Sequence, residues 1–167
     1  MKLNIKRFGT AINLSTAGVY LAYAVETTAG TRPTSGYTRI TGAKSTPSLN
    51  PAPETLETTT LDETEYKTYI DGLKDLGGAL EFTFNLTEEL IGQWDDLYDD
   101  WEAAKAEGKA TWFTIVIPDL EDSFYFKWNP SKMGLPETSV SSVLEITNYI
   151  TPTSAPEKRP KPTLTSA

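Results

Sequence analysis

The sequence predicts a mainly β fold with one α-helix, and three observations support this prediction. Short segments alternate apolar and polar residues with the period of two that a half-buried strand requires, most strictly at residues 80–86. Only residues 88–107 change to the spacing of a helix. A chain of 167 residues with 4 Trp, 8 Tyr and 6 Phe can also form a packed core. We therefore expect one domain, over residues 1–150.

Two segments near the start of the chain have strand-like alternation. Residues 2–8 alternate weakly and residues 19–25 alternate well. We expect residues 1–16 to form an extended N-terminal arm ahead of the second strand. The apolar residues through which the arm would make contacts are Leu3, Ile5 and Phe8.

A secretory signal peptide is the alternative interpretation of this region. Basic residues at positions 2, 6 and 7 precede an apolar run that ends in Ala22-Tyr23-Ala24, which imitates a cleavage site. Polar residues such as Asn13 and Ser15 interrupt the run, so the strand is favoured. No segment approaches the roughly 20 apolar residues of a transmembrane helix, and we expect no membrane partner.

A long segment rich in Thr, Ser and Pro follows a loop at residues 27–36 and a short strand expected at residues 37–40. We expect residues 42–62 to form a long inter-strand loop, because prolines favour an extended path. Loops longer than about 12–15 residues are usually functional or disordered, so a merely mobile loop is the alternative. The candidate contact residues are Lys44, Ser45, Thr46, Pro47, Leu49, Pro51, Pro53 and Leu56.

Strands are then expected at residues 66–70 and 80–86, with a turn between them marked by Gly72, Gly77 and Gly78. The helix follows at residues 88–107. Thr87 suits its N-cap, two glutamates suit its first turn, and Gly108 ends it. The residues expected to pack against the core are Leu90, Trp94, Leu97 and Trp101.

The remaining segments predict a β-hairpin, a last strand and a tail. Residues 111–117 and 123–128 are aromatic-rich strands around a short polar turn, and residues 140–150 form the last expected strand. Residues 151–167 contain four prolines and little that is apolar, so we expect a flexible C-terminal tail. Its candidate contact residues are Pro152, Pro156 and Arg159.

The composition argues against most catalytic chemistry. The chain has no Cys and no His, which excludes thiol nucleophiles, Cys/His zinc sites and Ser-His-Asp triads. A net charge of −8 disfavours binding to nucleic-acid phosphates. The acidic run at residues 95–100 falls on the outer face of the predicted helix, which favours a solvated surface over a metal site. We expect no catalytic residue, cofactor or metal, although a pair of distant carboxylates could still form a hydrolase site.

The four tryptophans leave a second non-enzymatic function open. Together they could form the aromatic platform of a carbohydrate-binding β-sandwich module. Their positions in the predicted helix and strands favour core packing for at least three of them.

Residues 42–86 resemble the major tail tube proteins of long, non-contractile-tailed bacteriophages, the siphoviruses and related prophages. The similarity is carried by Glu-Thr-Thr-Thr-Leu at residues 57–61, Tyr-Ile-Asp-Gly-Leu-Lys-Asp at 69–75 and Glu-Phe-Thr-Phe at 81–84. It extends more weakly over residues 15–150. The resemblance implies a β-sandwich or barrel-like fold flanked by a single helix, with a long inter-strand loop and extended arms at both termini.

The resemblance also implies a structural function. Members of that family form hexameric rings that stack into a hollow tube, with the long loop and the arms joining adjacent rings. The implied partners are other copies of this chain, a tape-measure protein in the lumen, distal tail and tail terminator proteins at the ends, and viral DNA in transit. The implied location is a virion tail assembled in the host bacterial cytoplasm. A different ring-forming tail protein, such as a terminator or distal tail protein, is the close alternative.

Overall fold

The computed structural model describes residues 16–49, 53–74, 76–140 and 142–165, and it confirms the mainly β fold with a single helix. The N-terminal arm with Leu3, Ile5 and Phe8 lies outside the described residues. The elements are β1 (Tyr20–Val25), β2 (Ser35–Ile40), β3 (Ala43–Ser45), β4 (Pro53–Glu57), β5 (Tyr69–Lys74), β6 (Leu80–Asn85), α1 (Glu88–Ala106), β7 (Thr111–Val116), β8 (Asp122–Pro130), β9 (Glu145–Pro152), β10 (Glu157–Pro160) and β11 (Thr163–Leu164).

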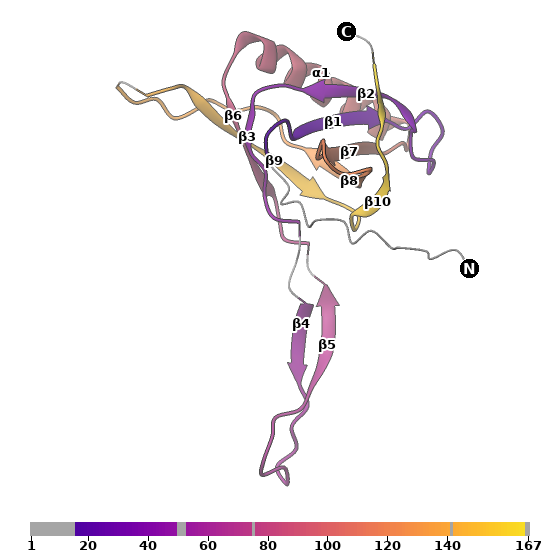
Figure 1. The fold of residues 1–167 in the computed structure, drawn as a ribbon, viewed down its shortest axis with the longest axis vertical. Helices are drawn as coiled ribbons and strands as arrows, with labels where there is room; N and C mark the ends of the chain where they lie inside the picture. The colour runs from indigo at the N-terminus through magenta and orange to yellow at the C-terminus, as the bar shows by residue number, and fades with distance from the viewer. Residues whose placement is uncertain (1–15, 50–52, 75, 141, 166–167) are drawn as a thin grey trace, which may run out of the picture.

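Most strands belong to one curled sheet, in the order β11-β2-β1-β7-β8-β9-β6-β3 (Figure 1). Strand β8 connects its two halves. Its residues 124–127 pair with β7, whereas residues 128–130 pair with β9. A nine-residue strand can therefore pair with β7 along one part and with β9 along the next, and the sheet folds over itself as a half-barrel.

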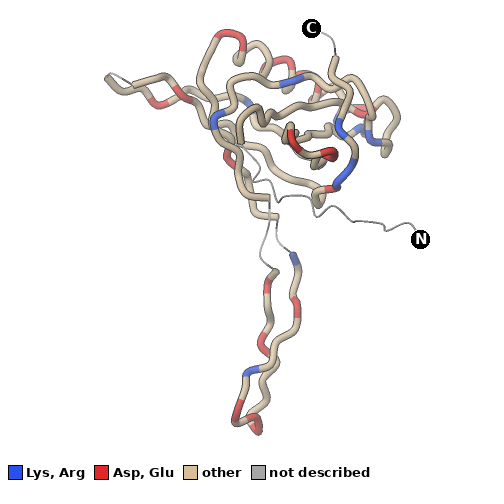
Figure 2. The backbone as a smooth tube through the Cα atoms, viewed as in Figure 1, with Lys and Arg blue, Asp and Glu red and all other residues tan. Residues whose placement is uncertain are grey.

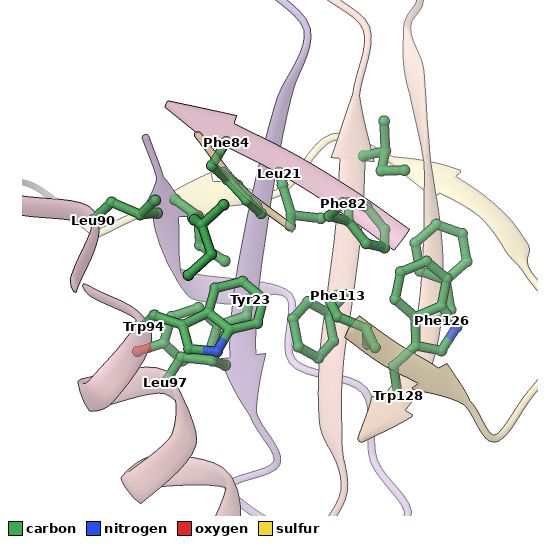
Figure 3. Close-up of a cluster of buried hydrophobic side chains, with 14 residues drawn as sticks. Leu21, Tyr23, Phe82, Phe84, Leu90, Trp94, Leu97, Phe113, Phe126 and Trp128 are labelled. Carbon is green, nitrogen blue, oxygen red and sulfur yellow. The ribbon is translucent and has the colours of Figure 1, made fainter. Parts of the chain in front are cut away.

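The core fills the concave side of this sheet, and α1 covers it (Figure 3). Leu90, Trp94 and Leu97 project from the helix and are fully buried. The flat rings of Phe126 and Trp128 stack with centroids 4.1 Å apart. The remaining members of the cluster include Leu21, Tyr23, Phe82, Phe84, Phe113, Ile146 and Ile150.

The helix begins where the sequence predicts it. The Thr87 hydroxyl accepts a hydrogen bond from the Leu90 backbone N–H at 3.1 Å, and Glu88 and Glu89 occupy the first turn. Trp101 differs from the prediction because it is only partly buried. Its indole packs on Tyr98 and donates to the Asn129 side chain at 3.1 Å, at the rim of the core.

The C-terminal residues are part of the sheet, which corrects the expected flexible tail at residues 151–167. Pro152 ends β9, while β10 pairs with β8 and β11 pairs with β2. Since β1 and β7 lie between β8 and β2, this segment joins two strands that are otherwise separated. Its prolines fit because edge strands tolerate residues without a backbone N–H.

A second small cluster lies between the C-terminal segment and the sheet. It contains Ala22, Ala24, Tyr37, Trp112 and Tyr125, with Leu164 packed against it. The Tyr125 hydroxyl donates to the Pro160 carbonyl at 2.6 Å, and the Thr165 N–H donates to the Tyr37 carbonyl at 2.9 Å. The C-terminal segment thus buries the apolar side chains on this face of the sheet.

The expected loop at residues 42–62 contains strands, which is a second correction. Residues 43–45 form β3 against β6, and β4 pairs with β5 to form a hairpin that projects from the body (Figure 1). The strand expected at residues 66–70 therefore belongs to the hairpin. Gly72 lies inside β5 instead of at a turn. A Cβ at this position in the strand would come within 3.2 Å of the Glu54 backbone oxygen. Strand pairing provides hydrogen-bond partners for backbone N–H and C=O groups that would bond only to water in an unpaired loop.

A second projection precedes the last long strand. The expected strand at residues 140–150 begins only at Glu145. Residues 131–144 instead extend away from the sheet between β8 and β9 (Figure 1). The base of this projection is fixed because the Trp94 indole donates to the Ser131 carbonyl at 2.9 Å, and the Ser131 N–H donates to Tyr149 at 2.8 Å.

Removing residues 154–167 should destabilise the fold. The truncation exposes Tyr37 and Tyr125 and removes the hydrogen bond to Pro160. Burial of a large side chain contributes about 1.5–3 kcal/mol and a hydrogen bond about 1 kcal/mol, so we expect a loss of roughly 2–4 kcal/mol in the free energy of unfolding. Urea denaturation followed by circular dichroism measures it.

Two single substitutions within β11 distinguish the effect of lost side-chain packing from the effect of shortening the chain. Leu164→Ala should lower the free energy of unfolding by about 1 kcal/mol, whereas Thr163→Ala, at an exposed position, should change it by less than about 0.5 kcal/mol. A truncated protein with an unchanged denaturation midpoint would contradict the assignment of this segment to the fold.

Candidate assembly surfaces

The hairpin carries apolar side chains that nothing in the described part of the chain covers. Leu61 and Leu73 are 107% and 84% exposed, and Tyr66 is 78% exposed. Leu56, Tyr69 and Ile70 are about half exposed. Isolated apolar residues on a surface are ordinary, but six on one projecting ribbon form a surface that is typical of a binding site.

The hairpin is held as a ribbon by its own polar groups. The Thr58 N–H donates to the Thr68 carbonyl at 2.8 Å, and the Thr68 N–H donates to the Thr59 hydroxyl at 3.0 Å. Lys67 pairs with Glu57 at 3.0 Å. These bonds extend the pairing beyond β4 and β5 toward the tip, so the ribbon keeps its shape away from the body.

The hairpin is also strongly acidic (Figure 2). Between residues 53 and 74 it has six carboxylates and two lysines. The acidic residues are Glu54, Glu57, Asp62, Glu63, Glu65 and Asp71, and the basic ones are Lys67 and Lys74. Hydrogen bonds from the Thr60 hydroxyl and its own backbone N–H lower the pKa of Asp62. The hairpin therefore presents negative charge and apolar side chains together.

The second projection forms another apolar surface. Leu135 and Val140 are 95% and 96% exposed, and Val143 is 70% exposed. An open groove of about 890 Å³ runs along its base, between the projection and strands β6 and β9. The two strands at the ends of the sheet order, β3 and β11, are both short. At the β3 end, the Lys44 ammonium forms an ion pair with Glu145 at 2.5 Å.

Basic residues gather on a different part of the body, around β10 and the loop before β2 (Figure 2). A groove of about 540 Å³ is lined by Arg32, Lys127 and Arg159, together with Trp112 and Glu157. A neighbouring groove of about 340 Å³ shares Lys127 and adds Lys105 and Lys109. We call these two cavities the basic groove.

Aromatic rings hold two of these cations in place. The Arg32 guanidinium lies 4.4 Å from the centre of the Tyr125 ring, and the Lys127 ammonium lies 5.3 Å from that of Trp112. Lys158 and Arg159 on β10 are exposed and make long ion pairs, at 3.6 Å to Asp122 and 3.5 Å to Glu157. Such exposed pairs bind weakly, so both side chains can interact with another molecule.

Glu26 lies at the edge of the basic groove and is buried, with 2% of its surface exposed. Its carboxylate accepts hydrogen bonds from the N–H groups of Gly30 at 2.8 Å, Ala110 at 3.0 Å and the Trp112 indole at 2.9 Å. Burial raises the pKa of Glu26, but the bonds from Trp112, Ala110 and Gly30 lower it more, so the pKa lies below its ordinary value. Glu26 therefore stays ionised and fixes the turn after β1.

The structure divides the predicted loop residues between the body and the hairpin. Lys44 and Ser45 lie in β3, and Leu49 packs partly buried against the core. Only Pro53 and Leu56 lie on the hairpin, while Pro51 lies outside the described residues. Thr46 and Pro47 follow β3 without regular structure.

The predicted contact residues near the C-terminus also lie on the body. Pro152 and Pro156 adjoin Leu49 over the core, and Arg159 lines the basic groove. Sequence analysis missed the most exposed apolar residues, Leu61, Leu73, Leu135 and Val140, because each stands alone among polar neighbours. The only signal that the sequence offers at these positions is a single apolar residue inside a polar segment.

Other kinds of site find no support in the described part of the chain. Trp94, Trp112 and Trp128 are at most 4% exposed, so they form no surface for sugar rings. Across the described ranges, no group of three or more acidic residues is arranged to hold a metal ion. Among the same residues, no helix has the length and hydropathy needed to cross a membrane. The acidic residues 95, 96, 99 and 100 of α1 are exposed, as predicted.

Comparison with known proteins shows the class of fold. No protein-family model matches the sequence, and no curated protein matches it. Among solved structures, the chain is similar to a chain of the anti-feeding prophage (AFP) baseplate, determined by cryo-EM and 6-fold symmetrised. The TM-score is 0.56 at 12% identity, and the match covers 90% of this chain and 96% of that chain. The two chains therefore share a fold over nearly their whole lengths.

Replacing Glu26 with Gln should cost about 2 kcal/mol of stability near neutral pH, because hydrogen bonds to a charged acceptor contribute about 1.5–3 kcal/mol. Since the folded-state pKa is lowered, the stabilisation is present above the ordinary value of 4.5 and is lost as the pH falls through the lower folded-state pKa. The difference between wild type and variant should therefore shrink in acid. Denaturation curves between pH 3 and about 7 measure it.

Glu107→Gln is the matched control, because Glu107 is exposed and bonded to Lys109. We expect it to leave stability nearly unchanged at any of these pH values, because exposed ion pairs contribute little. Equal losses in the two variants would contradict a specific role for the buried carboxylate.

Proposed function

We propose that this chain is a non-enzymatic structural subunit of a phage-tail-type particle, and that its copies form rings that stack into a hollow tube. The observation that carries the proposal is the projecting hairpin, whose apolar side chains find no cover within the chain. An isolated subunit gains nothing from exposing them, whereas neighbouring copies can bury them. The fold shared with a baseplate chain supports the same class of particle.

The two projections suit two kinds of contact. The hairpin extends far from the body and can reach a copy in the next ring. The projection between β8 and β9 extends from the body in another direction than the hairpin, and it can join neighbours within a ring together with the short β3 edge. We expect six copies in a ring, a tape-measure protein in the lumen, terminator and distal tail proteins at the ends, and a virion tail as the location.

The net charge of −8 suits a conduit for DNA. Negative charge repeated around a channel repels phosphates, so DNA can slide through it without binding. Assembly would take place in the cytoplasm of the host bacterium.

A subunit of a single ring at the end of a tail is the second candidate. It is favoured by one observation, that the similar chain comes from a baseplate instead of a tube. Such a subunit would form closed rings that do not stack. Negative-stain electron microscopy of the concentrated protein separates the two candidates, since uniform hollow rods support a tube and isolated rings support a terminal component. A particle that stays monomeric at every concentration would overturn both.

Replacing residues 53–74 by a short Gly-Ser linker should leave a folded body that does not stack. The hairpin pairs only with itself in the sheet order, so the body keeps its ladders and its core. We expect an unchanged thermal unfolding profile by circular dichroism and no rods by electron microscopy. Rods formed by this variant would contradict the role of the hairpin.

Leu61→Asp with Leu73→Asp tests the apolar side chains alone. Both leucines are exposed, so folding should change by less than about 0.5 kcal/mol, while a buried charge in a contact costs several kcal/mol. Leu61→Met with Leu73→Met keeps the apolar character and should assemble like the wild type. Light scattering against concentration distinguishes the variants.

A further inference from the structure

We propose that the basic groove of one copy is the docking site for the acidic hairpin of another copy. This rests on the proposed function and adds to it the surface that receives the hairpin. The groove is the part of the body where Arg32, Lys127 and Arg159 line one cavity and Lys105 and Lys109 line the adjoining one. The hairpin is the projecting segment with six carboxylates.

Charge is the first argument. In a chain with 23 acidic and 15 basic residues, a surface with five neighbouring cations is exceptional and selects an anionic partner. The two acidic residues that line the groove are already engaged, because Glu26 is buried under three hydrogen bonds and Glu157 pairs with Arg159. Lys109 pairs with Glu107 outside the groove, so Arg32, Lys105 and Lys127 supply most of the positive charge that is available to another molecule.

Shape is the second argument. The two cavities adjoin at Gly30 and Lys127, so the basic groove is elongated and open instead of a closed pocket. A two-stranded ribbon is about 5 Å between strands and fits along such a surface. The rings of Trp112 and Tyr125 hold two of the cations in place, so less side-chain entropy is lost when the ribbon binds.

Direction is the third argument. In Figure 1 the hairpin and β10 both run along the long axis of the molecule, and the hairpin points away from the body that carries β10. Copies in stacked rings are related by translation along an axis and rotation about it. An element parallel to that axis in one copy lies parallel to it in the next. A hairpin can thus lie beside β10 of a copy in the adjoining ring, where Lys158 and Arg159 face outward.

Cross-linking of the assembled wild-type protein locates the contact directly. A carbodiimide joins carboxylates and amines that are in contact, and peptide mass spectrometry identifies the pairs. We expect hairpin carboxylates, such as Glu63 and Glu65, to be joined to Lys105 or Lys127 between copies. Joining of the hairpin only to lysines outside the groove, such as Lys44 or Lys132, would overturn the proposal.

Charge reversal tests whether the contact drives assembly. Glu63→Lys with Glu65→Lys should raise the concentration needed for assembly roughly tenfold at low salt, and so should Lys105→Glu with Arg159→Glu, one substitution in each cavity of the groove. The chain with all four substitutions restores opposite charges and should recover most of the loss. Asp95→Lys with Asp99→Lys on α1 makes the same change in net charge away from both surfaces and should have little effect.

The outcomes separate this proposal from the proposed function. Wild-type protein that never assembles overturns both. Assembly that is normal in the hairpin and groove variants, or losses that the fourfold variant does not recover, overturns the docking site and leaves the tube subunit intact. Binding of a DNA oligonucleotide that Lys105→Glu with Arg159→Glu abolishes would assign the groove to nucleic acid and overturn hairpin docking.

Discussion

Strand β8 is the element on which the rest of the structure depends. Because its two halves pair with different neighbours, it joins the two parts of the curled sheet. Its side chains also serve both clusters: Phe126 and Trp128 stack inside the main core, whereas Tyr125 faces the C-terminal segment. Lys127, between them, points to the surface and lines both cavities of the basic groove. A single strand therefore connects the core to the candidate assembly surface.

The chain separates the residues that fold it from those that are proposed to join copies. Aromatic side chains fill the body, where stacking and burial stabilise the sheet without disulfides. The exposed leucines and most acidic residues of the two projections make no contact with that core. Such a division suits a structural subunit, because the body can fold before the projections find partners.

The candidate surfaces were only partly predictable. A long, Pro-rich segment signals that residues 42–62 leave the compact fold, and a hairpin does leave it there. The sequence could not show that residues 69–74 are the partner strand, since their alternation fits a strand in the body equally well. Of the cations in the basic groove, only Arg159 was among the predicted contact residues. The groove's cations come from positions 32, 105, 109, 127 and 159, and no local pattern connects residues so far apart.

The sequence by itself determined the strands with clear alternation, the one helix with its N-cap, and the exclusion of thiol and imidazole chemistry. These properties depend on neighbours within a few residues, where periodicity and capping act. Only the tertiary structure decided that the Pro-rich C-terminal residues are strands and that the basic side chains converge. Residues 157–164 have little tendency to form strands alone, and they become ordered because β8 and β2 offer unpaired backbone groups on either side. Long-range pairing of that kind overrides local composition, which is why a segment that looks like a loose tail covers the second cluster of the core.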